Sequence, residues 1–406
     1  MHQGPARAKS AATTRDVRLD FFRGIAMFII LISHTPDNWL TSWIPARWGF
    51  SDATEIFVFC SGMASAIAFG GVFAKRGMWL GTARVAFRTW QVYWVHIALF
   101  FAIATSMVAL NILLPYERDY IGQLNLYPFF KDPQTNLFGL LTLTYVPNYF
   151  DILPMYLVIL AMLPVMVLLS RAHVGLVFVT MFALWIMAQG RVLEALGLGD
   201  ISFNFPAEPW SARQWFFNPF GWQLVFFTGF AFMMRWIPSP PRATWLFIVA
   251  LMIVVANIPL SNVGVRELGF SWAGEWRSNN AIFITKSDFG ILRYVQFLAL
   301  AYVAWFLAGP SGERIVASDA AGMGGKIWTP ILSVIMKVGQ QSLAVFAFSM
   351  FFARLMGVMF DQIGRTHATM LFVNAIGFAA VIAIAYLAAW FKSQPWKTKR
   401  SPNASA

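Results

Sequence analysis

The chain has 406 residues, of which 58% are hydrophobic and only 12% are charged. A soluble domain carries about 25% charged residues, so this composition excludes a chain whose whole surface faces water. The net charge of +12 does not indicate nucleic acid as a partner, because the basic residues are distributed as a membrane-topology signal. We therefore predict an all-α polytopic membrane protein with about ten transmembrane helices.

The predicted spans follow from stretches of roughly 20 mostly apolar residues, which is the length that crosses a bilayer. No small-residue cleavage site follows the first of them, so we expect a retained helix rather than a signal peptide. A shorter apolar stretch at 136–147 is expected to form a partial or interfacial helix. The predicted spans are 20–38, 52–74, 86–113, 151–170, 174–190, 217–236, 243–260, 289–308, 328–352 and 367–391.

The orientation is predicted from Lys and Arg in the loops. With the N-terminus inside, 16 of these residues fall in inner segments, 10 in outer segments and four within spans. Ten spans place both termini in the cytoplasm. The predicted domains are a cytoplasmic tail over 1–18, one transmembrane domain over 19–391 and a cytoplasmic tail over 392–406. The single cysteine, Cys60, is expected to be a buried small side chain.

Four basic residues lie inside predicted spans, namely Arg23, Arg88, Arg293 and Lys337. A charge at membrane depth costs roughly 2.5–3.5 kcal/mol even on insertion scales, so it indicates function unless it snorkels or forms a structural ion pair. Arg23, Arg88 and Lys337 each lie in the inner half of a predicted span. We expect them to converge on an anionic ligand from the cytoplasm, and phosphate suits arginine best.

The outer half of the predicted bundle carries a histidine and several acids. His34 ends the first span, whereas Asp52 and Glu55 open the second and share one helix face because they are three residues apart. A carboxylate beside a histidine fixes its tautomer and supports its charged form, which is what a general base needs. We predict that Asp52 or Glu55 supports His34 as a catalytic base; the alternative is a structural histidine.

The spacing within the first span suggests the shape of the ligand. Arg23 and His34 are separated by roughly 16 Å along a helix at about 1.5 Å per residue. A phosphopantetheine thioester is long and thin enough to reach from one to the other. His96, in the middle of the third span, and Tyr93 are candidate wall residues of such a passage, although a buried structural histidine is an equal alternative for His96.

The outer loops combine aromatic rings with amides and acids, which suits a sugar, although anchoring at the membrane interface explains the tryptophans equally well. The candidate acceptor-binding residues are Asp151, Trp215, Asn218, Trp222, Gln223, Trp276 and Arg293.

Several segments resemble the membrane acyltransferase-3 superfamily. Its signature of an Arg, ten residues and a His is matched by Arg23 and His34. The branch that the chain is most similar to is the OpgC-type succinyltransferases of osmoregulated periplasmic glucans. The segments that carry the resemblance are Arg18-Leu-Asp-Phe-Phe-Arg23, Gly49–Gly62, Asp151–Tyr156, Asn218–Gln223 and Gly339–Phe346.

The resemblance implies a ten-helix fold in a bacterial inner membrane that moves an acyl group from cytoplasmic acyl-CoA to a periplasmic glucan. It implies His34 as the catalytic histidine and Arg23 as its signature partner. The superfamily often has an Arg-x-x-Arg pair on the third helix, but here Gln91 follows Arg88, with Arg84 one turn earlier. Only the branch implies succinyl rather than acetyl. The candidate donor-binding residues are Arg18, Arg23, Arg84, Arg88, Tyr93, His96 and Lys337.

The expected activity is that of an acyl-CoA-dependent O-acyltransferase with no permanently bound cofactor and no metal. Acyl-CoA, which we expect to be succinyl-CoA, is then the donor substrate. The alternative from another class is a transporter or flippase for a saccharide or lipid, in which His34, Arg23 and the acids bind substrate and relay protons without covalent chemistry.

Overall fold

The computed structural model describes residues 16–114, 118–317 and 322–397. Within them the fold is all-helical, as predicted, with no strand beyond one isolated bridge between Pro206 and Gln214. The first half contains α1 (Val17–His34), η1 (Trp39–Trp43), α2 (Pro45–Trp48), α3 (Ala53–Ser65), η2 (Ala66–Gly70), α4 (Gly71–Leu113), η3 (Gly122–Leu124), α5 (Tyr127–Lys131), α6 (Pro133–Thr142), α7 (Ile152–Ala172), α8 (Val174–Met187), α9 (Gly190–Ala195) and η4 (Gly199–Ile201). The second half contains α10 (Pro219–Met233), α11 (Thr244–Ala256), α12 (Asn262–Arg266), α13 (Ser271–Asn279), α14 (Ala281–Ile284), α15 (Ile291–Ala308), η5 (Pro310–Gly312), α16 (Met323–Gln340), α17 (Ser342–Ile363) and α18 (His367–Ser393).

Long apolar helices confirm the membrane character of the chain. Within the described residues, five helical segments are long and apolar enough to cross a bilayer, and α8, α10 and α11 are shorter apolar helices on three further predicted spans. α1 has 18 residues but carries several charges. The exact count of ten spans stays a prediction. The five long segments are Ala53–Leu113, Ile152–Ala172, Ile291–Ala308, Ser342–Ile363 and His367–Ser393.

The predicted loop between the second and third spans is wrong, because this stretch is helical. α3, the π-helical turn η2 and α4 follow one another without a loop, and the only non-helical residue inside α4 is Gly77, at φ +81°. The chain turns there, since the ring of Phe73 lies against Gly81. A positive φ suits glycine, which has no Cβ to clash. Two helical arms are therefore joined at a single residue.

The predicted span at 328–352 is also wrong, because the chain breaks there into two helices. α16 ends at Gln340 and α17 begins at Ser342. Only α17 qualifies as a long apolar segment. Lys337 consequently belongs to α16 rather than to a spanning helix, whereas Arg354, predicted to lie in an outer loop, is a residue of α17.

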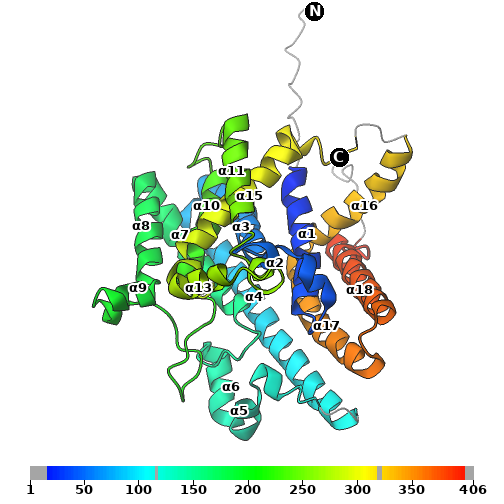
Figure 1. Ribbon diagram of the computed structural model, residues 1–406. Helices are drawn as coiled ribbons and strands as arrows, with labels where there is room; N and C mark the ends of the chain where they lie inside the picture. The colour runs from blue at the N-terminus through cyan, green and yellow to red at the C-terminus, as the bar shows by residue number, and fades with distance from the viewer. Residues whose placement is uncertain (1–15, 115–117, 318–321, 398–406) are drawn as a thin grey trace, which may run out of the picture.

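The helices form a bundle in which α3 is central, whereas α4 runs from the middle of the bundle towards its edge (Figure 1). α3 contacts α10 on one side and α1 on the other, while α4 contacts α7 and α17. α16, α17 and α18 lie together beside α1, and α7 and α8 lie on the opposite side. We call the two ends of this bundle the Arg23 end and the His34 end, after the residues near the start and the end of α1.

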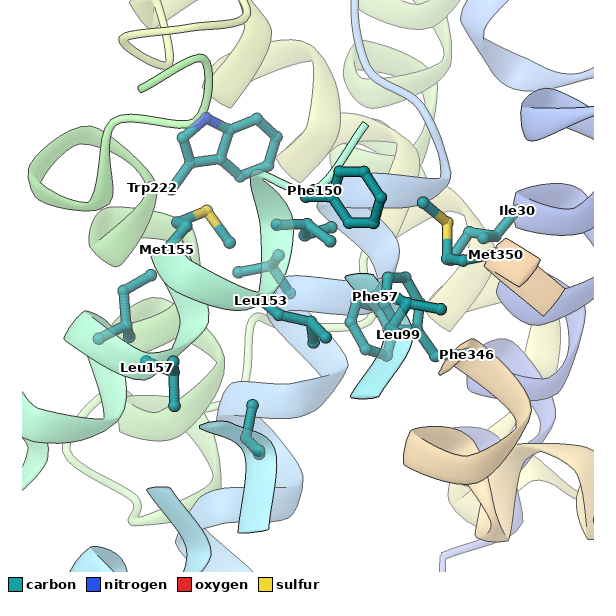
Figure 2. Close-up of a cluster of buried hydrophobic side chains, with 14 of the residues drawn as sticks. Ile30, Phe57, Leu99, Phe150, Leu153, Met155, Leu157, Trp222, Phe346 and Met350 are labelled. Carbon is teal, nitrogen blue, oxygen red and sulfur yellow. The ribbon is translucent and has the colours of Figure 1, made fainter. Parts of the chain in front are cut away.

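The centre of the bundle is filled by large apolar side chains. α10 is buried on almost every face, with Trp222, Phe226, Phe227 and Phe230 each inaccessible. A helix that is apolar all round belongs in the interior of a bundle. Figure 2 shows Trp222 and Met155 in one part of this core and Phe57, Leu99 and Phe346 in another. Cys60 is a buried free cysteine, as predicted.

Two glycines allow α3 and α10 to approach closely. A Cβ on Gly62 would lie 1.9 Å from the carbonyl oxygen of Phe226, and one on Gly229 would lie 2.3 Å from that of Phe59. Small residues at such reciprocal positions let backbones touch in a membrane, where dispersion rather than the hydrophobic effect holds helices together. This contact fixes α3, which begins at the candidate site.

We predict that Gly62→Ala and Gly229→Ala each destabilise the protein. An added methyl group must push the two helices apart, which costs about 1–3 kcal/mol in a packed core. Thermal melting of the purified protein in detergent measures the effect. Gly71→Ala is the matched control, since a Cβ at Gly71 meets nothing within 4 Å. Equal melting temperatures for Gly62→Ala and Gly71→Ala would contradict the prediction.

We further predict that both termini face the cytoplasm. The reason is the excess of Lys and Arg in the segments assigned to the inside. Reporter fusions at each terminus test this, with cytoplasmic signals expected from both. A periplasmic signal from the C-terminal fusion alone would mean an odd number of spans.

Candidate active site

A cavity of about 1080 Å³ opens at the His34 end of the bundle. His34 lines it, together with residues from the segments after α6 and α8, before α10 and before α15. The wall is mixed: aromatic rings stand beside amides, carboxylates and cations. The polar and aromatic lining includes Asn148, Tyr149, Asp151, Arg191, Glu194, Asp200, Asn204, Arg213, Trp215, Phe216, Phe217, Asn218, Lys286 and Asp288.

The imidazole of His34 is held by the backbone of its own helix. Its Nδ1 lies 2.8 Å from the carbonyl oxygen of Ile30, one turn earlier, and 3.1 Å from the hydroxyl of Ser33. A carbonyl oxygen only accepts, so Nδ1 carries the hydrogen and Nε2 has the lone pair. That is the tautomer in which Nε2 can accept a proton from a ligand in the cavity.

Asp52 and Glu55 begin α3 as a capping box. The side chain of Asp52 accepts from the backbone N–H of Thr54 at 2.6 Å, and Glu55 Oε2 accepts from the backbone N–H of Asp52 at 2.8 Å. This arrangement satisfies N–H groups that otherwise have no partner at a helix start. The three-residue spacing between Asp52 and Glu55 therefore allows the two side chains to cap the start of α3.

The same two carboxylates bind cations rather than His34. Asp52 pairs with Lys286 at 2.5 Å, and Glu55 accepts from Nε of Arg293 at 2.6 Å; Arg293 also lies 3.7 Å from Asp52. The hydrogen bonds of the His34 ring are to Ile30 and Ser33 instead. Neither Asp52 nor Lys286 has a hydrogen bond to the imidazole. The negative charge of Asp52 attracts the protonated imidazole, whereas the positive charge of Lys286 repels it.

Lys286 is a site residue that sequence reasoning missed. It lies in the segment before α15, and the sequence analysis used it only in the total of basic residues in outer loops. No motif near it in the sequence indicates a role in a site. Its ammonium group lines the cavity, pairs with Asp52 and lies 5.5 Å from the centre of the Phe217 ring. The structure thus brings Lys286 into the lining of the same cavity as His34, to which Arg191 and Arg213 also contribute.

Three predicted acceptor-binding residues line the cavity: Asp151, Trp215 and Asn218. The carboxylate of Asp151 accepts from the backbone N–H of Phe216 at 3.2 Å. Asn218 caps α10 through the backbone N–H of Phe220 and donates to Asp288 at 3.2 Å. These contacts set the side chains on the wall in fixed directions.

The other predicted acceptor-binding residues lie outside the cavity. Trp222 and Gln223 are fully buried; the indole N–H donates to the carbonyl of Lys286 at 2.9 Å and the Gln223 amide to that of Met181 at 2.7 Å. Trp276 stacks on Phe50 instead. Arg293 is occupied by Glu55 and Asp52. Trp222 and Arg293 therefore hold the wall in place without facing the cavity.

The charged part of the wall was also missed by sequence reasoning. Arg213 pairs with Glu208 at 3.0 Å and donates to the carbonyl of Val146 at 2.7 Å. Burial raises the pKa of the Asp288 carboxyl. Carboxylates, amides and aromatic rings together are the groups that bind sugar hydroxyls and sugar faces.

The Arg23 end carries a separate group of cations. Arg23 donates to the hydroxyl of Ser342 at the start of α17, and Lys392 donates to Gln341 at 2.6 Å. Arg23 of α1 and Lys392 of α18 therefore meet at adjacent residues, Ser342 and Gln341, beside the break between α16 and α17. Arg88 of α4 lies within electrostatic range of Lys392. We call these three residues the cationic cluster; Lys392, predicted to begin the tail, is its unforeseen member.

The remaining candidate donor residues are more dispersed. Arg18 is paired with Asp16 at 2.6 Å. Arg84 is exposed, while Arg88 donates to Gln91 at 3.3 Å. Lys337 lies 5.8 Å from the centre of the Tyr386 ring.

Tyr93 and His96 do not line the cavity that contains His34. Tyr93 donates to the carbonyl of Leu141 at 2.8 Å and borders a separate apolar groove of about 480 Å³ between α4 and α7. His96 is fully buried, and neither ring nitrogen has a hydrogen-bond partner among the described residues.

An apolar plug closes the cavity on the side of the cationic cluster. Ile30, Phe346 and Met350 form part of the cavity lining, and Phe57 stacks on Phe346 at 5.4 Å between ring centres. Leu99 belongs to the same buried cluster as these rings (Figure 2). Along α17, Phe346 therefore lies between Ser342, which accepts from Arg23, and Met350, which accepts from Tyr149 beside His34.

The comparisons with known proteins gave one match, to a protein family. No curated protein and no solved structure matches the chain. A match to the family described as OpgC protein covers residues 15–393, which include the cationic cluster, the plug and every residue of the cavity. The chain therefore belongs to the OpgC protein family.

Proposed function

We propose that the protein is a membrane-bound O-acyltransferase that moves an acyl group from cytoplasmic acyl-CoA to hydroxyls of a periplasmic glucan. The acyl group that we propose is succinyl. Family membership indicates a glucan-modifying acyltransferase. The observation that carries the finer proposal is His34, whose Nε2 has a lone pair at a wide cavity lined by polar and aromatic groups. The bacterial inner membrane is the location that this reaction requires.

The proposed chemistry needs a base and a group that stabilises negative charge. His34 Nε2 accepts the proton of a glucan hydroxyl while the oxygen attacks the thioester carbonyl. The new C–O bond forms, the C–S bond breaks, and the imidazolium returns the proton to the leaving thiolate. The Lys286 ammonium stabilises the negative charge that develops on the carbonyl oxygen, because it lines the same cavity as His34.

The donor is proposed to bind at the cationic cluster. Arg23, Arg88 and Lys392 offer guanidinium and ammonium groups to the phosphates of CoA. The pantetheine arm then follows the direction of α1 for roughly 16 Å to His34. The plug of Phe57 and Phe346 must move aside for the arm, and it otherwise separates the thioester from water.

The transporter alternative receives less support. A transporter needs a cavity that opens alternately to each side, and its turnover needs no acyl donor. Incubation of the purified protein with succinyl-CoA and glucan separates the two, since only the acyltransferase releases CoA and adds mass to the glucan. Transport of glucan without CoA release would overturn the proposal. Mass spectrometry of the glucan with different acyl donors identifies the acyl group.

We predict that His34→Ala lowers kcat by about 10²–10⁴-fold, the usual contribution of a general base. CoA release and glucan acylation by the purified variant measure this. His367→Ala is the matched control, because His367 is exposed at the start of α18. Near-normal kcat for His34→Ala, with unchanged melting temperature, would rule out its role as the base.

We predict that Arg23→Gln, Arg88→Gln and Lys392→Gln each weaken CoA binding about 10- to 150-fold. The loss of one hydrogen bond to a charged group costs about 1.5–3 kcal/mol. Titration of CoA against purified protein gives the affinity, while glucan binding should change little. Arg76→Gln serves as the control, as an exposed cation in the turn that precedes Gly77. Unchanged CoA affinity in all three cluster variants would place the donor site elsewhere.

A further inference from the structure

The backbone of Tyr149 is strained at the wall of the cavity. Tyr149 lies in the segment between α6 and α7 and has φ +86°. This left-handed region is rare for a bulky side chain, because its Cβ clashes with the backbone. Such strain persists only where surrounding contacts impose it, and it is concentrated at functional sites.

Contacts from α17 impose this conformation. The Tyr149 hydroxyl donates to the carbonyl of Met350 at 2.6 Å, and burial raises the pKa of that hydroxyl, so it remains a donor. The guanidinium of Arg354, one turn further along α17, lies 5.5 Å from the centre of the Tyr149 ring. Arg354 is itself held by Gln123 at 2.8 Å. The Tyr149 ring is therefore held by the hydrogen bond of its hydroxyl to Met350 and by the contact of one ring face with Arg354.

The other neighbour of this ring is His34. The two rings meet edge to face, with 5.4 Å between their centres and 81° between their planes. Nδ1 of His34 is anchored to Ile30, but this hydrogen bond still tolerates some tilt of the imidazole plane. A rigid ring against it removes that freedom.

We propose that Tyr149 is a positioning residue for His34. It fixes the plane of the imidazole so that Nε2 faces the cavity, and Arg354 and the Met350 carbonyl in turn fix Tyr149. The strained backbone brings the ring to this place. Orientation of a reacting group lowers the barrier only in the chemical step, so its loss reduces kcat rather than binding. This inference rests on the proposed role of His34 as the base.

Tyr149→Gly provides the sharpest test, because glycine adopts φ +86° without strain and lacks the ring. We expect a folded protein with kcat lowered about 30-fold or more and KM for succinyl-CoA and glucan within about threefold. Tyr149→Phe keeps the ring and should recover most of kcat. Leu143→Gly is the matched control: it relieves the same kind of backbone strain at φ +60°, away from His34, and should keep native kcat.

A double-mutant cycle distinguishes positioning from a general structural effect. In the His34→Ala background, Tyr149→Gly should lower the residual rate no further, because the group it positions is absent. A native kcat for Tyr149→Gly, or an equal further loss in the His34→Ala background, would overturn the inference. If His34→Ala itself retains native kcat, the proposed function fails instead, so the two failures are distinguishable.

Discussion

Two ion pairs at the His34 end, of which Glu55–Arg293 is buried and Asp52–Lys286 is partly exposed, determine how the cavity is built. Asp52 and Glu55 begin α3, Lys286 precedes α15, and Arg293 lies in its first turn. Charges removed from water must be paired, and loss of one partner leaves the other uncompensated at a cost of about 3–5 kcal/mol. The start of α3 is therefore tied to the start of α15. Through Trp222, which binds the Lys286 carbonyl, α10 is tied to the same place.

α1 and α17 connect the two ends of the proposed reaction path. Near one end, Arg23 binds Ser342; near the other, His34 meets Tyr149, which binds Met350 of α17. Between these contacts, Phe57 stacks on Phe346. The pair of helices thus offers cations for a phosphate at one end and a base at the other, with apolar rings between them. This division suits a reaction in which neither the charged donor nor the large acceptor crosses the membrane.

Local patterns in the sequence predicted the helical class, the apolar segments and the buried cysteine. They also selected Arg23 and His34 as candidate site residues. Hydropathy and helical spacing are properties of neighbouring residues, so they can be recognised without a fold. The same reasoning predicted Asp52 and Glu55 on one helix face, and the structure shows that face as a capping box. It missed the helix break at Gln341, because α16 and α17 are apolar enough together to resemble a single span.

Only the tertiary structure decided which side chains meet. Lys286 lies 234 residues from Asp52, and Lys392 reaches the cationic cluster from the last helix. No spacing rule links such residues, because their approach depends on how whole helices pack. The fold likewise turned Trp222 and Gln223 into buried supports rather than ligands for a sugar. Sequence fixes which residues are costly to bury, whereas the packing of distant helices chooses the partners that make their burial possible.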